Sequence, residues 1–208
     1  MQIIPVKTPD FVKALFPNFT WNINTKNKEL YLTFDDGPTP EITNWVLSTL
    51  KDFNAKATFF CIGNNIEKHP DIYNNILSQG HSIGNHTYNH LKGWKHKTRH
   101  YTEDVKRTQL LINSNVKLFR PPYGKLKPKQ SLQIQELGYK IILWDVLSFD
   151  WDKAVSKEKC LKNVTSAANE GSIIVFHDSI KASQNLKYTL PKVLEYYSKK
   201  GYCFKSLK

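Results

Sequence analysis

Residues 29–38 read ELYLTFDDGP, and the fold prediction starts from this stretch. The segment Glu29 to Phe34 is apolar and aromatic, so we expect it to form a β-strand. Asp35 and Asp36 follow directly, and Gly37-Pro38 is a dipeptide that favours a turn over a continued strand. The sequence therefore places two adjacent carboxylates at the point where a strand ends.

Short apolar runs alternate with longer segments of helical spacing along the rest of the chain. Six more strands are predicted, at Lys56 to Ile62, His81 to Asn85, Lys117 to Arg120, Tyr139 to Trp144, Ser172 to Phe176 and Tyr202 to Phe204. Helices are predicted at Pro40 to Phe53, Pro70 to Gln79, Thr102 to Asn113, Lys129 to Leu137, Lys157 to Asn169 and Leu186 to Lys199. This alternation implies right-handed crossovers and a mainly parallel sheet, either open or closed into a barrel.

The organisation of the chain favours one domain. Its 208 residues are 40% hydrophobic and contain no internal repeat or low-complexity linker. Residues 1–28 lie outside the alternating pattern, so we expect an N-terminal strap followed by a domain at residues 29–208. Three widely spaced cysteines, Cys61, Cys160 and Cys203, form no C-x-x-C pair and are interpreted as free thiols.

The formal net charge of +12 favours an anionic partner. The lysines are scattered, however, and no nucleic-acid motif is present, so we predict no nucleic-acid partner. The N-terminus has no apolar stretch of signal-peptide length, and no later segment is long enough to span a membrane. These features predict a cytoplasmic chain, and a monomer is the favoured oligomeric state.

Chemically reactive side chains cluster after the predicted strands. The loops in question carry Asp35, Asp36, His86, His90, Arg120, Asp145, Asp150, His177 and Asp178. In a parallel barrel such loops share the carboxyl-terminal face, where the active sites of barrel enzymes are found.

His86 and His90 are four residues apart, so a helical turn after Asn85 would bring both imidazoles to one face. With an aspartate from another strand end, two histidines resemble a catalytic zinc site with an open position. The paired aspartates could then divide the work, because one could bind a cation while its neighbour accepts a proton from water. A turn or helix-capping role explains one of the two aspartates equally well.

Residues 120–124 read RPPYG and predict a rigid corner after the fourth strand. The Arg120 guanidinium could hold a neighbouring carboxylate in its ionised state, and the Tyr123 N–H could point towards a ligand. Taken alone, the segment predicts only a turn.

Five segments occur in the order found in one enzyme family: TFDDGP, HTYNH, RPPYG, LWDVLSFDW and VFHD. In this the chain resembles the polysaccharide deacetylases, which form carbohydrate esterase family 4 and share the NodB homology domain. The resemblance extends from about Leu30 to the C-terminus. It implies a distorted (β/α) barrel of about seven parallel strands and a metal-dependent enzyme that removes N-acetyl groups from sugars.

The resemblance also implies roles for individual residues. Asp35 would be the catalytic base steadied by Arg120, and His177 would be the general acid. The Tyr123 N–H would help to stabilise an oxyanion. Asp36, His86 and His90 would bind one divalent metal ion, with zinc favoured and cobalt, nickel or manganese as alternatives. The substrate pocket would include Trp144, Asp150, Trp151 and Phe176.

One position departs from the family pattern. Many members have an aspartate four residues before the tryptophan of the fifth-strand motif, where it pairs with the general-acid histidine, but this chain has Leu147 four residues before Trp151. Without a carboxylate partner, the pKa of His177 should fall to about 6.5 or below. Asp145 and Asp150 are the candidate substitutes, and we favour Asp150 because it adjoins Trp151.

The predicted reaction is removal of acetate from a glycan that contains N-acetylglucosamine, of the chitooligosaccharide or peptidoglycan type. Two alternatives remain open at this point: a related amide or ester hydrolase that acts on a small molecule, and a catalytically weak glycan-binding module. A glycan substrate would place the enzyme in the cell envelope or outside the cell, in tension with the cytoplasmic prediction.

Overall fold

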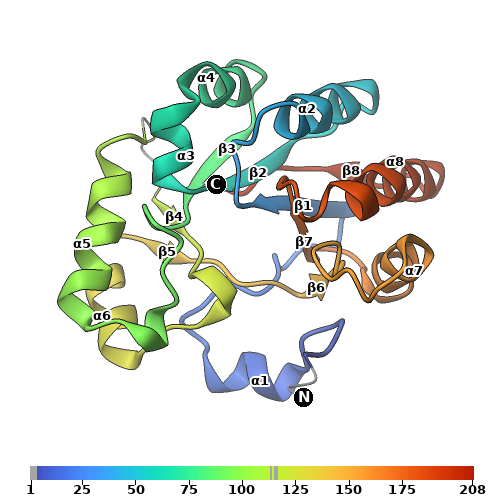
Figure 1. The fold of residues 1–208 in the computed structure, drawn as a ribbon. Helices are drawn as coiled ribbons and strands as arrows, with labels where there is room; N and C mark the ends of the chain where they lie inside the picture. Colours follow the sequence, from blue (N-terminus) through green and yellow to red (C-terminus); the bar gives the residue numbers. More distant parts are fainter. Residues whose placement is uncertain (1–3, 113, 115–116) are drawn as a thin grey trace.

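A parallel β-sheet, curled into a half-barrel, forms the centre of the molecule (Figure 1). The computed structural model describes residues 4–112, 114 and 117–208. The strands are β1 (Glu29–Asp35), β2 (Ala57–Cys61), β3 (Ser82–Asn85), β4 (Leu118–Phe119), β5 (Lys140–Ile141), β6 (Val146–Leu147), β7 (Ile173–His177) and β8 (Cys203–Phe204). Their order across the sheet is β5-β4-β3-β2-β1-β7-β6, and β8 also pairs with β1. The predicted distorted barrel is confirmed.

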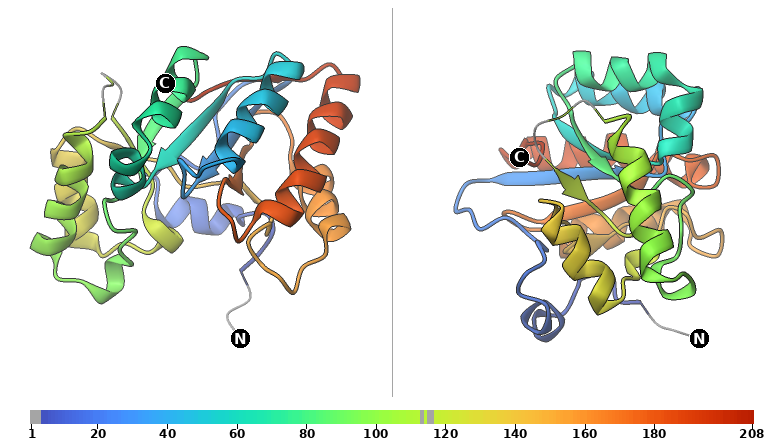
Figure 2. Two further views of the ribbon diagram at one scale, coloured as in Figure 1. Left: turned by 45° about the horizontal axis from the view of Figure 1, so that its top comes forward. Right: turned by 90° about the vertical axis from the view of Figure 1, so that its left-hand side faces the viewer.

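Helices form an arc around the outside of this sheet, as Figures 1 and 2 show from three directions. They are α2 (Ile42–Asp52), α3 (Gly63–Lys68), α4 (Pro70–Ser78), α5 (Thr98–Gln109), α6 (Pro128–Glu136), α7 (Lys157–Ala167) and α8 (Ser183–Lys199), with short 3₁₀ turns at Gly93–Lys95 and Pro122–Gly124. Residues with a known preference for helix N-termini mark where some of these helices begin. Helix α4 begins at a proline, and the Ser156 hydroxyl accepts a hydrogen bond from the Lys159 N–H at the start of α7.

The N-terminal segment lies along the seam between β5 and β6. Three isolated β-bridges attach it there: Lys7 to Val146, Thr20 to Ile142 and Asn22 to Ser172. Helix α1 (Asp10–Leu15) lies between Lys7 and Thr20 in the chain. The described part of the expected strap, residues 4–28, therefore packs against the two ends of the curled sheet. The division of the chain at residue 28 stays a prediction.

Alternation along the strands separates the packed core from the interior of the half-barrel. In β1, Leu32 and Phe34 belong to the main core cluster, where Phe34 stacks on Phe59 and Phe176 with ring centroids 5.0 and 6.0 Å apart. Because side chains alternate between the two faces of a strand, Asp35 lies on the opposite face from Phe34. The core therefore holds the strand whose end carries the two aspartates.

Several element predictions need correction. The predicted strand from Tyr139 to Trp144 is only Lys140–Ile141, and the separate strand β6 follows it, unpredicted. Helix α3 was also unpredicted, and α5 begins at Thr98, four residues before the expected start. The expected end of α5, Asn113, lies outside the described residues. Within the described ranges, no helix is long and apolar enough to span a membrane.

Candidate active site

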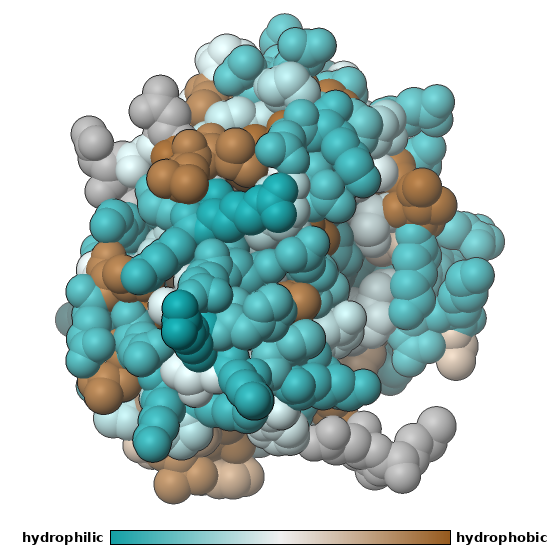
Figure 3. Space-filling view, turned by 60° about the vertical axis from the view of Figure 1, so that its left-hand side comes forward, coloured by the Kyte–Doolittle hydropathy of each residue, from teal (hydrophilic) through white to brown (hydrophobic). Residues whose placement is uncertain are grey.

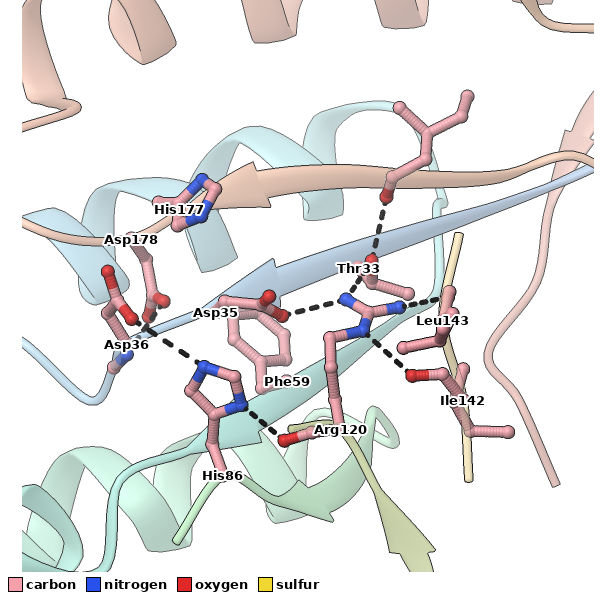
Figure 4. A network of polar contacts seen from close by, with 12 residues as sticks. Thr33, Asp35, Asp36, Phe59, His86, Arg120, Ile142, Leu143, His177 and Asp178 are labelled. Carbon is pink, nitrogen blue, oxygen red and sulfur yellow. Dashed lines mark hydrogen bonds and ion pairs between the residues drawn. The ribbon is translucent and has the colours of Figure 1, made fainter. Parts of the chain in front are cut away.

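The two neighbouring aspartates at the end of β1 point in different directions (Figure 4). Asp35 is the last residue of the strand, and its buried side chain points towards Arg120. Asp36 has left-handed backbone geometry, with φ of 83°, which turns its carboxylate towards the two histidines. In a continued strand the two carboxylates would point to opposite faces of the sheet. The turn at Asp36 instead directs its carboxylate to the histidines, while Asp35 keeps its contact with Arg120.

The turn after Asp36 is held by a carboxylate that the sequence prediction left without a role. Asp178 is fully buried; its Oδ1 accepts a hydrogen bond from the Gly37 N–H at 3.0 Å, and its Oδ2 accepts one from the Thr43 hydroxyl at 2.5 Å. A Cβ atom at Gly37 would lie only 2.0 Å from Asp178 Oδ2, so only glycine fits there. Burial raises the pKa of Asp178 to about 7, although the hydrogen bond from Thr43 acts in the opposite direction.

His86 and His90 converge through a tight turn, not through the predicted helical turn. Thr87 and His90 both have left-handed backbone geometry, with φ of 63° and 54°. The two rings nevertheless approach closely, with centroids 5.1 Å apart. The prediction of a shared helical face was therefore wrong, while the prediction that the imidazoles converge is confirmed.

Asp104 on α5 holds this histidine turn in place. Its Oδ2 accepts hydrogen bonds from the Tyr88 and Asn89 N–H groups at 2.7 and 3.0 Å, and its Oδ1 accepts one from the Asn89 side chain at 2.6 Å. Asn85 adds a hydrogen bond from the Thr87 N–H to its Oδ1 at 2.9 Å. Buried acceptors on two elements thus replace the helical hydrogen bonds that the sequence pattern suggested.

Asp36, His86 and His90 form a group that could hold a metal ion, with their three potential ligand atoms within 4.8 Å of one another. Asp36 Oδ1 is 3.8 Å from His86 Nε2 and 3.2 Å from His90 Nε2. His86 Nδ1 lies 2.8 Å from the Arg120 carbonyl oxygen, which can only accept. The proton of neutral His86 is therefore on Nδ1, and the Nε2 lone pair faces Asp36, as metal binding requires.

The protonation states of this group also suit metal binding. Burial lowers the pKa of His86 to about 4, so its imidazole is neutral at pH 7. Burial alone would raise the pKa of Asp36, but the hydrogen bond with His90 and the positive charge of His177 hold it well below the usual range. A neutral imidazole and an ionised carboxylate are the forms in which these side chains bind a cation.

Arg120 is fully buried and binds Asp35 as the sequence predicted. Its Nη1 donates to Asp35 Oδ1 and to the Thr33 hydroxyl, each at 2.7 Å. Its Nε and Nη2 donate to the carbonyl oxygens of Ile142 and Leu143 (Figure 4). A buried guanidinium with this many fixed acceptors keeps a set position, and it orients the Asp35 carboxylate.

His177 is paired with Asp150, the substitute that we favoured. Asp150 Oδ1 lies 2.8 Å from His177 Nδ1, and Asp150 Oδ2 accepts a hydrogen bond from the His177 backbone N–H at 2.8 Å. Burial acts to lower the pKa of His177, but Asp150 outweighs it and raises the pKa to about 9. The low pKa expected for a His177 without a carboxylate partner therefore does not apply, because Asp150 supplies the charge that Leu147 lacks.

Three aromatic side chains border these groups. The Tyr123 ring, 58% exposed, lies 4.8 Å from the His90 ring, and the Trp151 ring lies 4.7 Å from that of His177. Trp144 packs against Gly124, next to Tyr123. Trp144 and Trp151 therefore lie where a substrate could contact them.

The prediction that Phe176 lines the substrate pocket was wrong. Phe176 precedes His177 in β7 and so faces the core, where it is fully buried. Asp145 is also directed away from the site, towards Lys7 and Lys13. His81 is buried and accepts a hydrogen bond from the Ala57 N–H, as expected for a core histidine.

Comparisons with known proteins point to one enzyme family. Residues 22–142 match the family model described as polysaccharide deacetylase. A peptidoglycan-N-acetylglucosamine deacetylase of Bacillus cereus is 39% identical over 155 residues, which are 73% of this chain and 56% of that protein. The chain thus spans about half the length of this relative.

A second Bacillus cereus protein with the same name is 33% identical over 190 residues, covering 89% of each chain. Among solved structures, the Bc1960 peptidoglycan N-acetylglucosamine deacetylase superposes with a TM-score of 0.87 at 34% identity. That superposition covers 96% of this chain and 95% of the other. The similarity in fold therefore extends over nearly the whole chain.

Proposed function

The chain belongs to the polysaccharide deacetylase family, and on this basis we propose that it hydrolyses the N-acetyl group of an N-acetylglucosamine-containing glycan and releases acetate. The main observation in support of this proposal is that three groups of side chains lie together at one end of the sheet. A two-histidine, one-aspartate cluster lies beside an aspartate held by Arg120 and a histidine held by Asp150. The names of the relatives favour peptidoglycan as the polymer.

We assign one divalent metal ion to Asp36, His86 and His90, with zinc favoured because two imidazoles and one carboxylate match its preferred ligands. Cobalt, nickel and manganese could use the same donors. When bound, such an ion lowers the pKa of a coordinated water from about 15.7 towards 7 and polarises the acetyl carbonyl group.

The remaining steps belong to residues of the chain. Asp35 accepts the proton of the attacking water, and Arg120 keeps this carboxylate oriented through the 2.7 Å contact. The Tyr123 N–H donates to the developing oxyanion. His177 donates a proton from Nε2 to the departing amine, because Asp150 holds Nδ1 and keeps the imidazole protonated. One deacetylation thus produces acetate and a free amino sugar.

Acetate release tests this proposal. The protein, before and after chelation, is incubated with peptidoglycan, with chitooligosaccharides and with a small acetylated amide or ester. We expect release from a glycan, loss on chelation and recovery on addition of zinc. Release from the small molecule alone would favour a small-molecule hydrolase, whereas glycan binding with no acetate from any substrate would favour a binding module.

A further inference from the structure

A basic cavity of about 520 Å³ is lined by segments that follow Asp150 and His177 closely in the chain. Its walls come from the loop between β6 and α7, which carries Asp150, from the loop between β7 and α8, which follows His177, and from the first turns of α7 and α8. Three lysines line it, Lys153, Lys157 and Lys181, with a single carboxylate, Glu158. The volume is sufficient for a sugar-sized group, since ligand pockets commonly occupy about 300–1,000 Å³.

The cavity wall is tied directly to the groups that would perform the reaction. The Asn185 side chain, which lines the cavity, donates hydrogen bonds to the carbonyl oxygens of Asp150 and Val155 at 3.3 and 3.0 Å. Asp150 in turn holds His177, and Trp151 lies against the same imidazole. A glycan whose reacting amine lies at His177 would therefore bring a neighbouring sugar towards this cavity.

The charges in the cavity are only partly neutralised. Lys157 Nζ lies 4.0 Å from Glu158 Oε1 and 4.8 Å from the centre of the Tyr188 ring. Lys153 and Lys181 are exposed and form no ion pair with any residue that the structure describes. Exposed ammonium groups gathered at one cavity attract an anion, and they do so most strongly at low ionic strength.

We propose that this cavity binds a carboxylate of the glycan, so that the enzyme prefers an anionic glycan to a neutral one of the same length. The inference rests on the proposed function and specifies its substrate class. The stem peptides of peptidoglycan carry carboxylates of this kind, as do the lactyl groups of strands that have lost their peptides, whereas chitooligosaccharides carry none. The preference would therefore follow from charge complementarity beside His177.

The test compares a peptidoglycan-derived tetrasaccharide that has free lactyl carboxylates with its methyl ester, which has nearly the same shape but no negative charge. The variant carries Lys153→Gln, Lys157→Gln and Lys181→Gln. Its control carries Lys26→Gln, Lys51→Gln and Lys106→Gln, three exposed lysines that do not line the cavity. Both variants remove three lysine charges, so they lower the net charge equally.

For the cavity variant we expect kcat/KM on the free acid to fall about tenfold, mainly through KM, with little change on the methyl ester. The control variant should keep the wild-type preference for the acid. An equal loss on both substrates, or no loss on the acid, would overturn the proposal.

Equilibrium binding separates this inference from the proposed function. Calorimetry with the acid and the ester should show tighter binding of the acid to the wild type and no such difference in the cavity variant. If the wild type released no acetate but bound the acid preferentially through these lysines, the proposed function would fail while the cavity assignment stood. Equal binding of acid and ester by the wild type would reject the cavity assignment.

Discussion

At the scale of single residues, adjacent Asp35 and Asp36 have different environments because the backbone turns between them. Asp35 ends a strand and contacts a buried guanidinium, while Asp36 has a φ of 83° and faces two imidazoles. Neither residue could take the other's place without rebuilding the turn. The residues can therefore be tested separately.

Replacing Asp35 should remove the proton acceptor and leave the metal ligands intact. For Asp35→Asn we expect kcat to fall by about 10²- to 10⁴-fold while zinc content stays at the wild-type level. Acetate release and elemental analysis on the same sample measure both quantities. Asp36→Asn is the matched comparison and should lose metal. Near-normal turnover by Asp35→Asn would contradict the assigned role.

The contact between Asp150 and His177 predicts a change in pH dependence. The pKa of His177 is raised to about 9 by Asp150, so the acid form persists at neutral pH and is lost as the pH rises through that value. In Asp150→Asn the alkaline limb of the kcat profile should therefore move to lower pH. Asp152→Asn, which removes a nearby carboxylate that caps the Ala154 N–H, should leave the limb in place. An unmoved limb in Asp150→Asn would reject the pairing.

At the scale of elements, the strand and helix pattern was largely readable from the sequence, whereas the histidine turn was not. Spacing of four residues suggested a helix, but the turn forms because Asp104 and Asn85 supply acceptors for its N–H groups. Asp104 lies on a helix 15 or more residues away in sequence. No local signal identifies such a partner.

Other parts of the site were predictable to different degrees. Ordered motifs correctly indicated the contact of Arg120 with Asp35, and adjacency to Trp151 indicated Asp150. Phe176 was misassigned because the motif was used without strand alternation, which places it on the core face opposite His177. Asp178 was unassigned because its partner, Gly37, is 141 residues away.

Removing the Asp104 carboxylate, which accepts hydrogen bonds from the histidine turn, should weaken metal binding although Asp104 is not itself a metal ligand. For Asp104→Ala we expect zinc affinity to fall by about 10- to 100-fold, as is typical when groups that orient ligands are lost. Competition with a chromogenic chelator measures the affinity. Asp104→Asn, which keeps one acceptor oxygen, should lose less. Unchanged affinity in Asp104→Ala would show that the turn holds its shape without this carboxylate.

At the scale of the whole molecule, the N-terminal strap is fastened at the seam by one buried carboxylate. Asp145 accepts hydrogen bonds from Lys7, Lys13 and Ser172 at 3.0, 2.7 and 2.5 Å. Burial opposes ionisation of Asp145, but these three donors lower its pKa below the usual value. The strap thus closes the side of the half-barrel between β5 and β6 (Figure 1).

This arrangement predicts an effect on stability. Asp145→Ala should lower the free energy of unfolding by about 1–3 kcal/mol, since it removes one hydrogen-bond acceptor from each of Lys7, Lys13 and Ser172 and the carboxylate nearest to the mostly buried Lys13 ammonium. The wild-type contribution should be present above the unfolded pKa of about 3.9 and be lost as the pH falls through the lower folded value. Urea denaturation at pH 7 and pH 3 measures both. Equal stability of variant and wild type at pH 7 would contradict a fastening role.

The charge of the surface also affects how the molecule binds a polymeric substrate. Figure 3 shows a largely hydrophilic face with separate hydrophobic patches, in keeping with a chain of net charge +12. The basic cavity beside His177 gives this charge a local function that a uniform surface charge would not provide. Substrate preference should therefore depend on three lysines near the site more than on the total charge.

The central claim is that Asp36, His86 and His90 hold one divalent ion on which deacetylation depends. Titrating chelator-treated protein with zinc while recording acetate release from peptidoglycan tests it most directly. The account predicts that activity is absent without zinc and rises to a plateau at one equivalent per chain. The double variant His86→Ala, His90→Ala should bind no zinc tightly and stay inactive at every concentration. Full acetate release by the metal-free protein, or by the double variant, would contradict the account.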